Sequence, residues 1–335
     1  MILESGAVLK DVRLRYTTLG KYQGSESRVV WIFHPLTCDS NPANWWPEFV
    51  GEGKVIDPNH SFIICVNALG SCYGSSGPSA EIDGLTAGLD FPIVTIKDIV
   101  RAFQVLKESL GIQKIDLGIG GSFGGQQLLE WLAADPDAFA KACVIGANAK
   151  QSPWAIAFNE TQRMALEADA DFTSSAPHAG AKGLAAARAI AILSYRTYET
   201  YGKSQGEESD AKHDQFKAAS YQRYIGQKFT ARFDAKSYWY LTKAMDSHNI
   251  ARSRRHCSEV LASIETRILL LSLKGDVLFP EEEMRELARG LPYAQYHSID
   301  STHGHDGILA NADLILAQLE LFLNQTTLCM RVQSL

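Results

Sequence analysis

The sequence predicts an α/β protein in which a mostly parallel, doubly wound sheet is interrupted by a helical insertion. Short apolar runs bounded by turn residues, such as Val29–Phe33 and Phe62–Val66, are typical of strands buried on both faces of a parallel sheet. Between about residues 95 and 145, strand patterns alternate with helix patterns, as a doubly wound sheet requires. From about residue 153 to 263, helical periodicity replaces this alternation.

The first half of the chain contains the elements of such a sheet in order. Residues 7–19 alternate apolar and polar side chains, which indicates a half-exposed antiparallel strand region. Thr95 is suited to cap a helix that ends near Leu110. A strand, a helix and a further strand are then expected, at residues 115–119, 126–134 and 142–145.

The alternation of predicted strands and helices resumes after the helical segment. A strand is expected at 268–273, a helix at 281–289, a strand at 294–299 and a last helix at 306–323. We therefore expect residues 1–152 and 264–335 to form the sheet core and residues 153–263 to form a helical lid. Residues 203–214 are polar and charged and are expected to form an exposed or disordered loop in this lid. Residues 324–335 carry no interpretable pattern.

Composition excludes several classes of protein. The 335 residues are 46% hydrophobic, which is enough for a large core. With 32 basic and 38 acidic residues, the chain lacks the basic excess that binds nucleic acid or anionic membranes. No apolar run approaches the roughly 18 residues of a membrane span, and the first residues lack a signal-peptide pattern. A cytoplasmic protein is expected.

Cysteine and histidine spacing predicts neither disulfides nor a metal centre. The six cysteines form no CxxC pair, and the histidines form no H-E-x-x-H motif, so we expect reduced thiols and no metal. Cys65 and Cys143 lie in apolar runs and are expected in the core. Cys38 and Cys72 lie in loops near the presumed site and are candidates for reactive thiols.

The segment Gly120-Gly121-Ser122-Phe123-Gly124 matches G-x-S-x-G and lies between a predicted strand and a predicted helix. This is the setting of a nucleophile elbow, in which a sharp turn exposes the serine at a helix N-terminus. There, backbone N–H groups favour developing negative charge. No lysine follows, so the segment is not a P-loop. A glycine-rich turn without chemistry is the alternative.

A serine nucleophile needs a base and a carboxylate that orients the base. Asp276 follows the strand at 268–273, and His305 precedes the last helix, so the order serine, acid, histidine is that of the α/β-hydrolase fold. His303 is a rival base two residues away. The alternatives are an ordinary turn aspartate and solvated loop histidines. The oxyanion hole is expected from the N–H groups of Phe123 and of Leu36, which follows the strand ending at Phe33.

These motifs together resemble the homoserine O-acetyltransferase family, over about residues 3–323. The matching segments include the elbow, the acid and base loops, an oxyanion loop, a long glycine-rich loop and parts of the lid. They lie at residues 34–40, 67–78, 91–98, 120–127, 157–163, 232–238, 241–246, 276–280 and 304–306. The resemblance selects His305 over His303.

The resemblance implies transfer of an acetyl group from acetyl-CoA to the hydroxyl of L-homoserine through an acyl-serine. It also implies that Arg163 binds the substrate carboxylate, that Asp306 receives the substrate ammonium, and that the chain forms a homodimer through lid helices. A lid-surface ion pair is the alternative role for Arg163, and a helix cap is the alternative role for Asp306.

The sequence departs from the family in its shorter middle and at Phe123, where the family usually has methionine. Because phenylalanine is bulkier and stiffer than methionine, this difference predicts an acyl pocket of different shape. Three alternative activities therefore stay open. They are O-succinyl transfer to homoserine, O-acetyl transfer to L-serine, and ester or thioester hydrolysis by the same triad.

Overall fold

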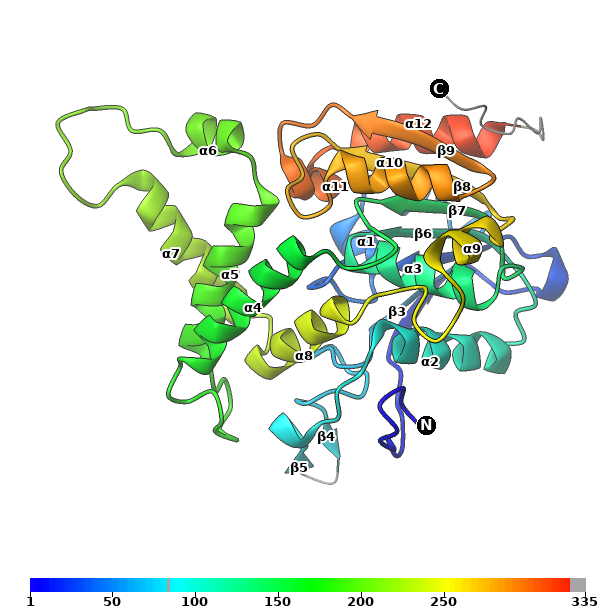
Figure 1. Ribbon diagram of the computed structural model, residues 1–335, viewed down its shortest axis with the longest axis horizontal. Helices are drawn as coiled ribbons and strands as arrows, with labels where there is room; N and C mark the ends of the chain where they lie inside the picture. Colours follow the sequence, from blue (N-terminus) through cyan, green and yellow to red (C-terminus); the bar gives the residue numbers. More distant parts are fainter. Residues whose placement is uncertain (83–84, 326–335) are drawn as a thin grey trace.

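The computed structural model describes residues 1–82 and 85–325 and consists of a central sheet, its flanking helices and a group of helices that stands off the sheet (Figure 1). The sheet has seven strands in the order β1-β3-β2-β6-β7-β8-β9, and all pairs are parallel except β1 with β3. The predicted fold class is therefore confirmed. The strands are β1 Tyr16–Leu19, β2 Val29–Phe33, β3 Phe62–Val66, β6 Ile115–Gly121, β7 Phe139–Ile145, β8 Arg267–Leu273 and β9 Ala294–Ile299, and a separate pair is formed by β4 Glu81–Ile82 and β5 Leu85–Thr86.

Helices cover both faces of the sheet, which explains the uninterrupted apolar runs of its strands. Alternate residues of a strand point to opposite faces, so Trp31 belongs to one apolar layer and Val30 to the other. The first layer is covered by α2, α3, α9 and α10, and the second by α1, α11 and α12. These helices are α1 Pro42–Trp45, α2 Ile96–Ser109, α3 Phe123–Ala134, α9 Cys257–Ala262, α10 Glu281–Gly290, α11 Gly307–Ala310 and α12 Ala312–Asn324.

The remaining helices of the insertion project from one end of the sheet (Figure 1). We call them the lid: α4 Pro153–Glu167, α5 Ala181–Tyr195, α6 Tyr198–Gln205, α7 Lys217–Thr230 and α8 Ala235–Asp246. The loop after α6 is exposed, as predicted from its polar composition, but it begins at residue 206, because residues 203–205 belong to α6. Helix α9 falls within the segment predicted as lid, but it packs against α10 beside the sheet.

Two predicted elements differ from the structure. Only Tyr16–Leu19 of the region 7–19 is a strand, because the Arg13 and Arg15 N–H groups donate to the hydroxyls of Ser76 and Ser75 instead of to a neighbouring strand. The last helix is broken at Asn311, whose backbone is not helical and whose side chain bonds to the Ser301 hydroxyl. No helix of residues 1–82 and 85–325 is long and apolar enough to cross a membrane.

Candidate active site

Ser122 lies at the turn between β6 and α3, with a φ of 56° and a ψ of −126°. Such a backbone strains an L-residue, and it is tolerated where the surroundings enforce it. The turn also requires glycine on both sides. A Cβ at Gly120 would lie 2.5 Å from the Gly124 carbonyl oxygen, and a Cβ at Gly124 would lie 2.1 Å from the Phe33 carbonyl oxygen. The tight packing of the elbow against β2 therefore fixes the position of the serine.

The structure brings Ser122, His305 and Asp276 together from three separate loops. The Nε2 of His305 lies 2.8 Å from the Ser122 Oγ, and its Nδ1 lies 2.6 Å from Oδ2 of Asp276. The other carboxylate oxygen of Asp276 accepts N–H bonds from Leu278 at 2.9 Å and Phe279 at 3.0 Å. These bonds orient the carboxylate, and the carboxylate orients the imidazole.

The His305 ring lies between aromatic neighbours from the core and the lid. The Phe279 ring stacks on it at 5.3 Å between centroids, and the Tyr195 ring at the end of α5 lies at 5.5 Å. Burial lowers the pKa of His305, but the charge of Asp276 and its hydrogen bond, with a smaller contribution from Asp306, raise it by more. The net pKa is above the ordinary histidine value of 6.5. The imidazolium is thus stabilised once a proton arrives.

Two backbone N–H groups are free near the serine. Among the described residues, neither the Leu36 nor the Phe123 N–H donates to any acceptor. Phe123 is the first residue of α3, where N–H groups have no intrahelical partner. Leu36 lines the same cavity as Ser122. The Phe123 side chain is fully buried in the core and does not line that cavity, so the residue that differs from the family does not shape the cavity with its side chain.

His34 holds the Leu36 peptide in place, a role that the sequence analysis did not assign. The Ala68 N–H donates to its Nε2 at 3.1 Å, so the proton of the neutral ring is on Nδ1. Nδ1 therefore donates to the Pro35 carbonyl oxygen at 2.8 Å. Because this carbonyl and the Leu36 N–H belong to one planar peptide group, the bond also fixes the direction of the N–H. Burial lowers the pKa of His34, which keeps the ring neutral.

A cavity of about 80 Å³ opens at Ser122 between the core and the lid. Its lining includes Leu36, Arg188 from α5, Tyr195, His305 and Asp306. Arg188 has no ion-pair partner among the described residues, and its guanidinium lies over the Phe229 ring at 4.9 Å. A half-buried guanidinium without a counter-ion beside a nucleophile is suited to bind an anionic group.

Arg163 lies outside this cavity, contrary to the expected contact with substrate. Its side chain is only 2% exposed, and its Nη2 lies 2.5 Å from carboxylate oxygens of both Glu160 and Asp246. Helix α4 packs against α8 there, so Arg163 joins two lid helices. These contacts match the alternative role, an ion pair, except that Arg163 is buried and not on the lid surface.

Asp306 lines the cavity, as expected of a ligand for the substrate ammonium. Its side chain makes no capping hydrogen bond to the helix that follows; its Oδ2 lies 2.8 Å from Nε of Arg196, directly after α5. The alternative role, a helix cap, is therefore not seen, because the carboxylate turns toward Arg196. Within the described chain, His303 forms no hydrogen bond with Ser122 or Asp276, whereas His305 forms one with each.

The loop cysteines are not activated thiols. Burial raises the pKa of Cys38 to about 12 and that of Cys72 to about 11, so little thiolate forms at neutral pH. Cys65 and Cys143 are buried in the core, as predicted. Cys329 lies outside the described residues. Within residues 1–82 and 85–325, no cluster of histidine, cysteine or carboxylate side chains is arranged to hold a metal ion.

Comparison with known proteins identifies the family of this chain. The family model for the alpha/beta hydrolase fold matches residues 36–311. The chain is 44% identical to a homoserine O-acetyltransferase of Cyclobacterium marinum over 309 residues, which are 92% of this chain and 88% of that protein. The chain belongs to the homoserine O-acetyltransferase family. The homoserine O-acetyltransferase of Staphylococcus aureus has a similar structure, with a TM-score of 0.83, 30% identity, and coverage of 99% of this chain and 94% of that one.

The fold of this family is shared by hydrolases. Esterase E22 aligns with a TM-score of 0.88 and 22% identity over 97% of both chains, a likeness that concerns the fold alone. The sheet therefore does not decide the activity; the side chains around Ser122 do. Among the residues that line this cavity, Arg188 is the one that the sequence analysis missed. The pattern that could have indicated Arg188 is a single charged residue in the otherwise largely apolar residues 183–195 of α5.

Proposed function

We propose that this protein transfers an acetyl group from acetyl-CoA to the hydroxyl of L-homoserine. The observation that carries the proposal is the hydrogen-bonded chain Ser122–His305–Asp276 at a cavity that also presents Arg188 and Asp306. An α-amino acid carries a carboxylate and an ammonium, and the cavity offers one side chain of the opposite charge for each. Membership of a family whose relatives are homoserine O-acetyltransferases supports this acceptor.

In the first half-reaction, His305 accepts the Ser122 proton while Oγ attacks the thioester carbonyl of acetyl-CoA. Asp276 stabilises the resulting imidazolium. The Leu36 and Phe123 N–H groups bind the tetrahedral oxyanion, and one such donor is typically worth about 3 kcal/mol of barrier. The C–S bond then breaks, and CoA leaves with the proton from His305.

In the second half-reaction, the homoserine hydroxyl gives its proton to His305 and attacks the acetyl-serine. The tetrahedral oxyanion forms in the same hole, and Ser122 leaves with the proton returned by His305. Arg188 binds the homoserine carboxylate and Asp306 binds its ammonium, so we transfer the role expected for Arg163 to Arg188. The lid excludes water from the acyl-enzyme, because water in place of homoserine would make the protein a thioesterase.

The test is CoA release from acetyl-CoA by the purified protein, with and without L-homoserine. Release that requires homoserine supports the transferase, and Ser122→Ala should abolish it. Release without an acceptor would contradict transfer and identify a thioesterase. Release only from succinyl-CoA would overturn the donor, and release only with L-serine would overturn the acceptor.

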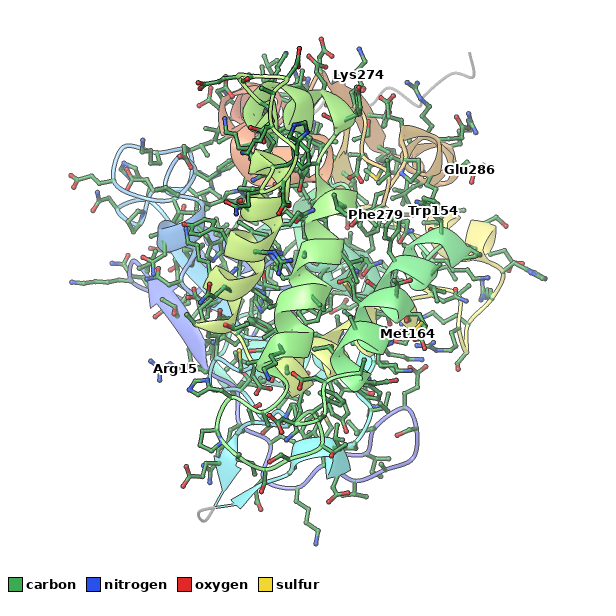
Figure 2. All side chains as sticks on the ribbon, turned by 90° about the vertical axis from the view of Figure 1, so that its left-hand side faces the viewer. Arg15, Trp154, Met164, Lys274, Phe279 and Glu286 are labelled. Atoms are coloured by element: carbon green, nitrogen blue, oxygen red, sulfur yellow. The ribbon has the colours of Figure 1, made fainter. Side chains whose placement is uncertain are left out.

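We also propose that a second copy of the chain covers the outer face of the lid in the cytoplasm. Large apolar side chains are exposed there, among them Trp154 and Met164 of α4, which are 58% and 61% exposed (Figure 2). Leu193 of α5 and Tyr224 of α7 are exposed as well. Sedimentation of the wild type as a dimer, and of Trp154→Ser/Met164→Glu as a folded monomer, would support this arrangement. A monomeric wild type would refute it.

A further inference from the structure

Arg232 connects the lid to the loop that carries the Leu36 N–H. It lies between α7 and α8, and its Nη1 donates to the Thr37 carbonyl oxygen at 2.6 Å. Nη1 also donates to the Tyr73 hydroxyl at 3.0 Å, and Nη2 donates to Thr37 Oγ1 at 3.3 Å. One guanidinium thus binds both the backbone and the side chain of the residue directly after Leu36.

In the described chain, this contact is the sole hydrogen-bonded link between the lid and residues 34–38. Within residues 1–82 and 85–325, no other lid residue makes a hydrogen bond with residues 34–38. From the core side, His34 and the Cys38 N–H hold the Pro35 carbonyl. The Pro35 carbonyl is therefore held by His34, whose ring is bonded to Ala68 of the core, and the Thr37 carbonyl is held by Arg232, so the Leu36 N–H lies between two anchored peptides.

The guanidinium of Arg232 is itself held in place by the lid. It lies over the Phe229 ring of α7, 4.9 Å from the ring centroid, and the Arg188 guanidinium lies over the same ring at the same distance. The cation of the acceptor site and the cation that holds the oxyanion loop therefore share one aromatic support. A displacement of α7 would move both.

We propose that Arg232 is a positioning residue that couples the seating of the lid to the oxyanion hole. The inference rests on the proposed acyl-serine chemistry. When the lid is seated, Arg232 fixes the Thr37 peptide, and the Leu36 N–H points at the developing oxyanion. When the lid lifts, the loop loses its second anchor and acylation slows. The enzyme is thereby active only while the lid excludes water.

The test uses p-nitrophenyl acetate, whose acetyl group is transferred to Ser122 Oγ as p-nitrophenolate leaves. This small ester needs neither CoA nor homoserine, so the rate of the first turnover reports on acylation alone. Loss of a whole oxyanion donor costs about 100-fold or more, and loss of one of two anchors should cost less. We expect Arg232→Ala to acylate about 10-fold more slowly, with Arg232→Lys between it and the wild type.

Added guanidinium ion should restore part of the rate of Arg232→Ala, because it can occupy the vacated site, whereas a merely structural defect would not respond. The matched control is Arg223→Ala on α7, since the Arg223 side chain is exposed and forms no hydrogen bond or ion pair within the described residues. It should acylate at the wild-type rate.

Arg232→Ala acylating as fast as the wild type would overturn the inference. So would a slow rate that guanidinium leaves unchanged and that falls in proportion to a lowered melting temperature. An unacylated wild type would instead refute the serine chemistry of the proposed function, so the two failures are distinct.

Discussion

Arg196 and Asp306 form an ion pair 2.8 Å long that joins the end of α5 to the loop that carries His305. Tyr195, the preceding residue, lies against the His305 ring, and the Thr197 hydroxyl donates to the Thr302 carbonyl. The end of α5 thus rests on the base loop, as Arg232 rests on the oxyanion loop. Charges in this contact bear directly on the proton affinity of His305.

The first prediction concerns the pH dependence of acylation. Only neutral His305 accepts a proton, and its pKa is raised above 6.5, so the rate should rise with pH through a pKa above 6.5. Asp306 contributes to the raised pKa. Asp306→Asn should therefore move the rise to lower pH, and Arg196→Ala, which removes a cation beside Asp306, should move it to higher pH. First-turnover rates with p-nitrophenyl acetate measure both. Shifts in the same direction would contradict the electrostatic account.

The second prediction separates Arg188 from Arg163. A hydrogen bond to a charged group contributes about 1.5–3 kcal/mol, so Arg188→Ala should raise the KM for homoserine about 10- to 100-fold. Acetylation of Ser122 by p-nitrophenyl acetate should change little.

Arg163→Met is the matched control. It should leave the KM nearly unchanged but lower the free energy of unfolding by on the order of 3 kcal/mol, because Asp246 loses its buried cation. The opposite pattern of KM effects would return the carboxylate contact to Arg163.

The third prediction concerns His34. His34→Gln removes the bond that fixes the Pro35–Leu36 peptide, so acylation should slow by about 10- to 100-fold, a fraction of a lost oxyanion donor. The KM for homoserine should stay near the wild-type value, because the acceptor side chains are untouched. His248→Gln is the control, since His248 is an equally buried histidine outside the cavity. Equal slowing in both variants would mean that general loosening of the fold is the cause.

The fourth prediction concerns stability in acid. Burial lowers the pKa of His248 to about 4 from the ordinary 6.5, so the unfolded chain binds this proton first as the pH falls. The contribution of neutral His248 to the free energy of unfolding is intact above pH 6.5 and is lost between pH 6.5 and about 4. At 1.36 kcal/mol per pKa unit, the loss is on the order of 3 kcal/mol. His248→Gln should therefore unfold in urea with a free energy that falls less steeply over this interval. Parallel curves for the two proteins would contradict this.

Much of the fold was predictable because it depends on local pattern. Buried parallel strands appear as apolar runs, and the elbow at Ser122 appears as glycines at fixed spacing, since any Cβ at Gly120 or Gly124 would clash with backbone. The chain order of Ser122, Asp276 and His305 follows from the loops at the ends of β6, β8 and β9. A strand end has a fixed place in a parallel sheet, so residues there are brought together by topology.

Tertiary structure decided what the lid contributes. The sequence of α4 and α5 shows that both are helices but not which face meets the cavity, because that depends on how the helices pack. Arg163 pairs with Asp246 of α8, and Arg188 lines the cavity that opens at Ser122. Likewise, no sequence pattern near His34 indicates its bond to the Pro35 carbonyl. No sequence pattern near Arg232 indicates its contact with Thr37, which is 195 residues away. Contacts between segments this distant depend on side-chain packing, which sequence periodicity does not record.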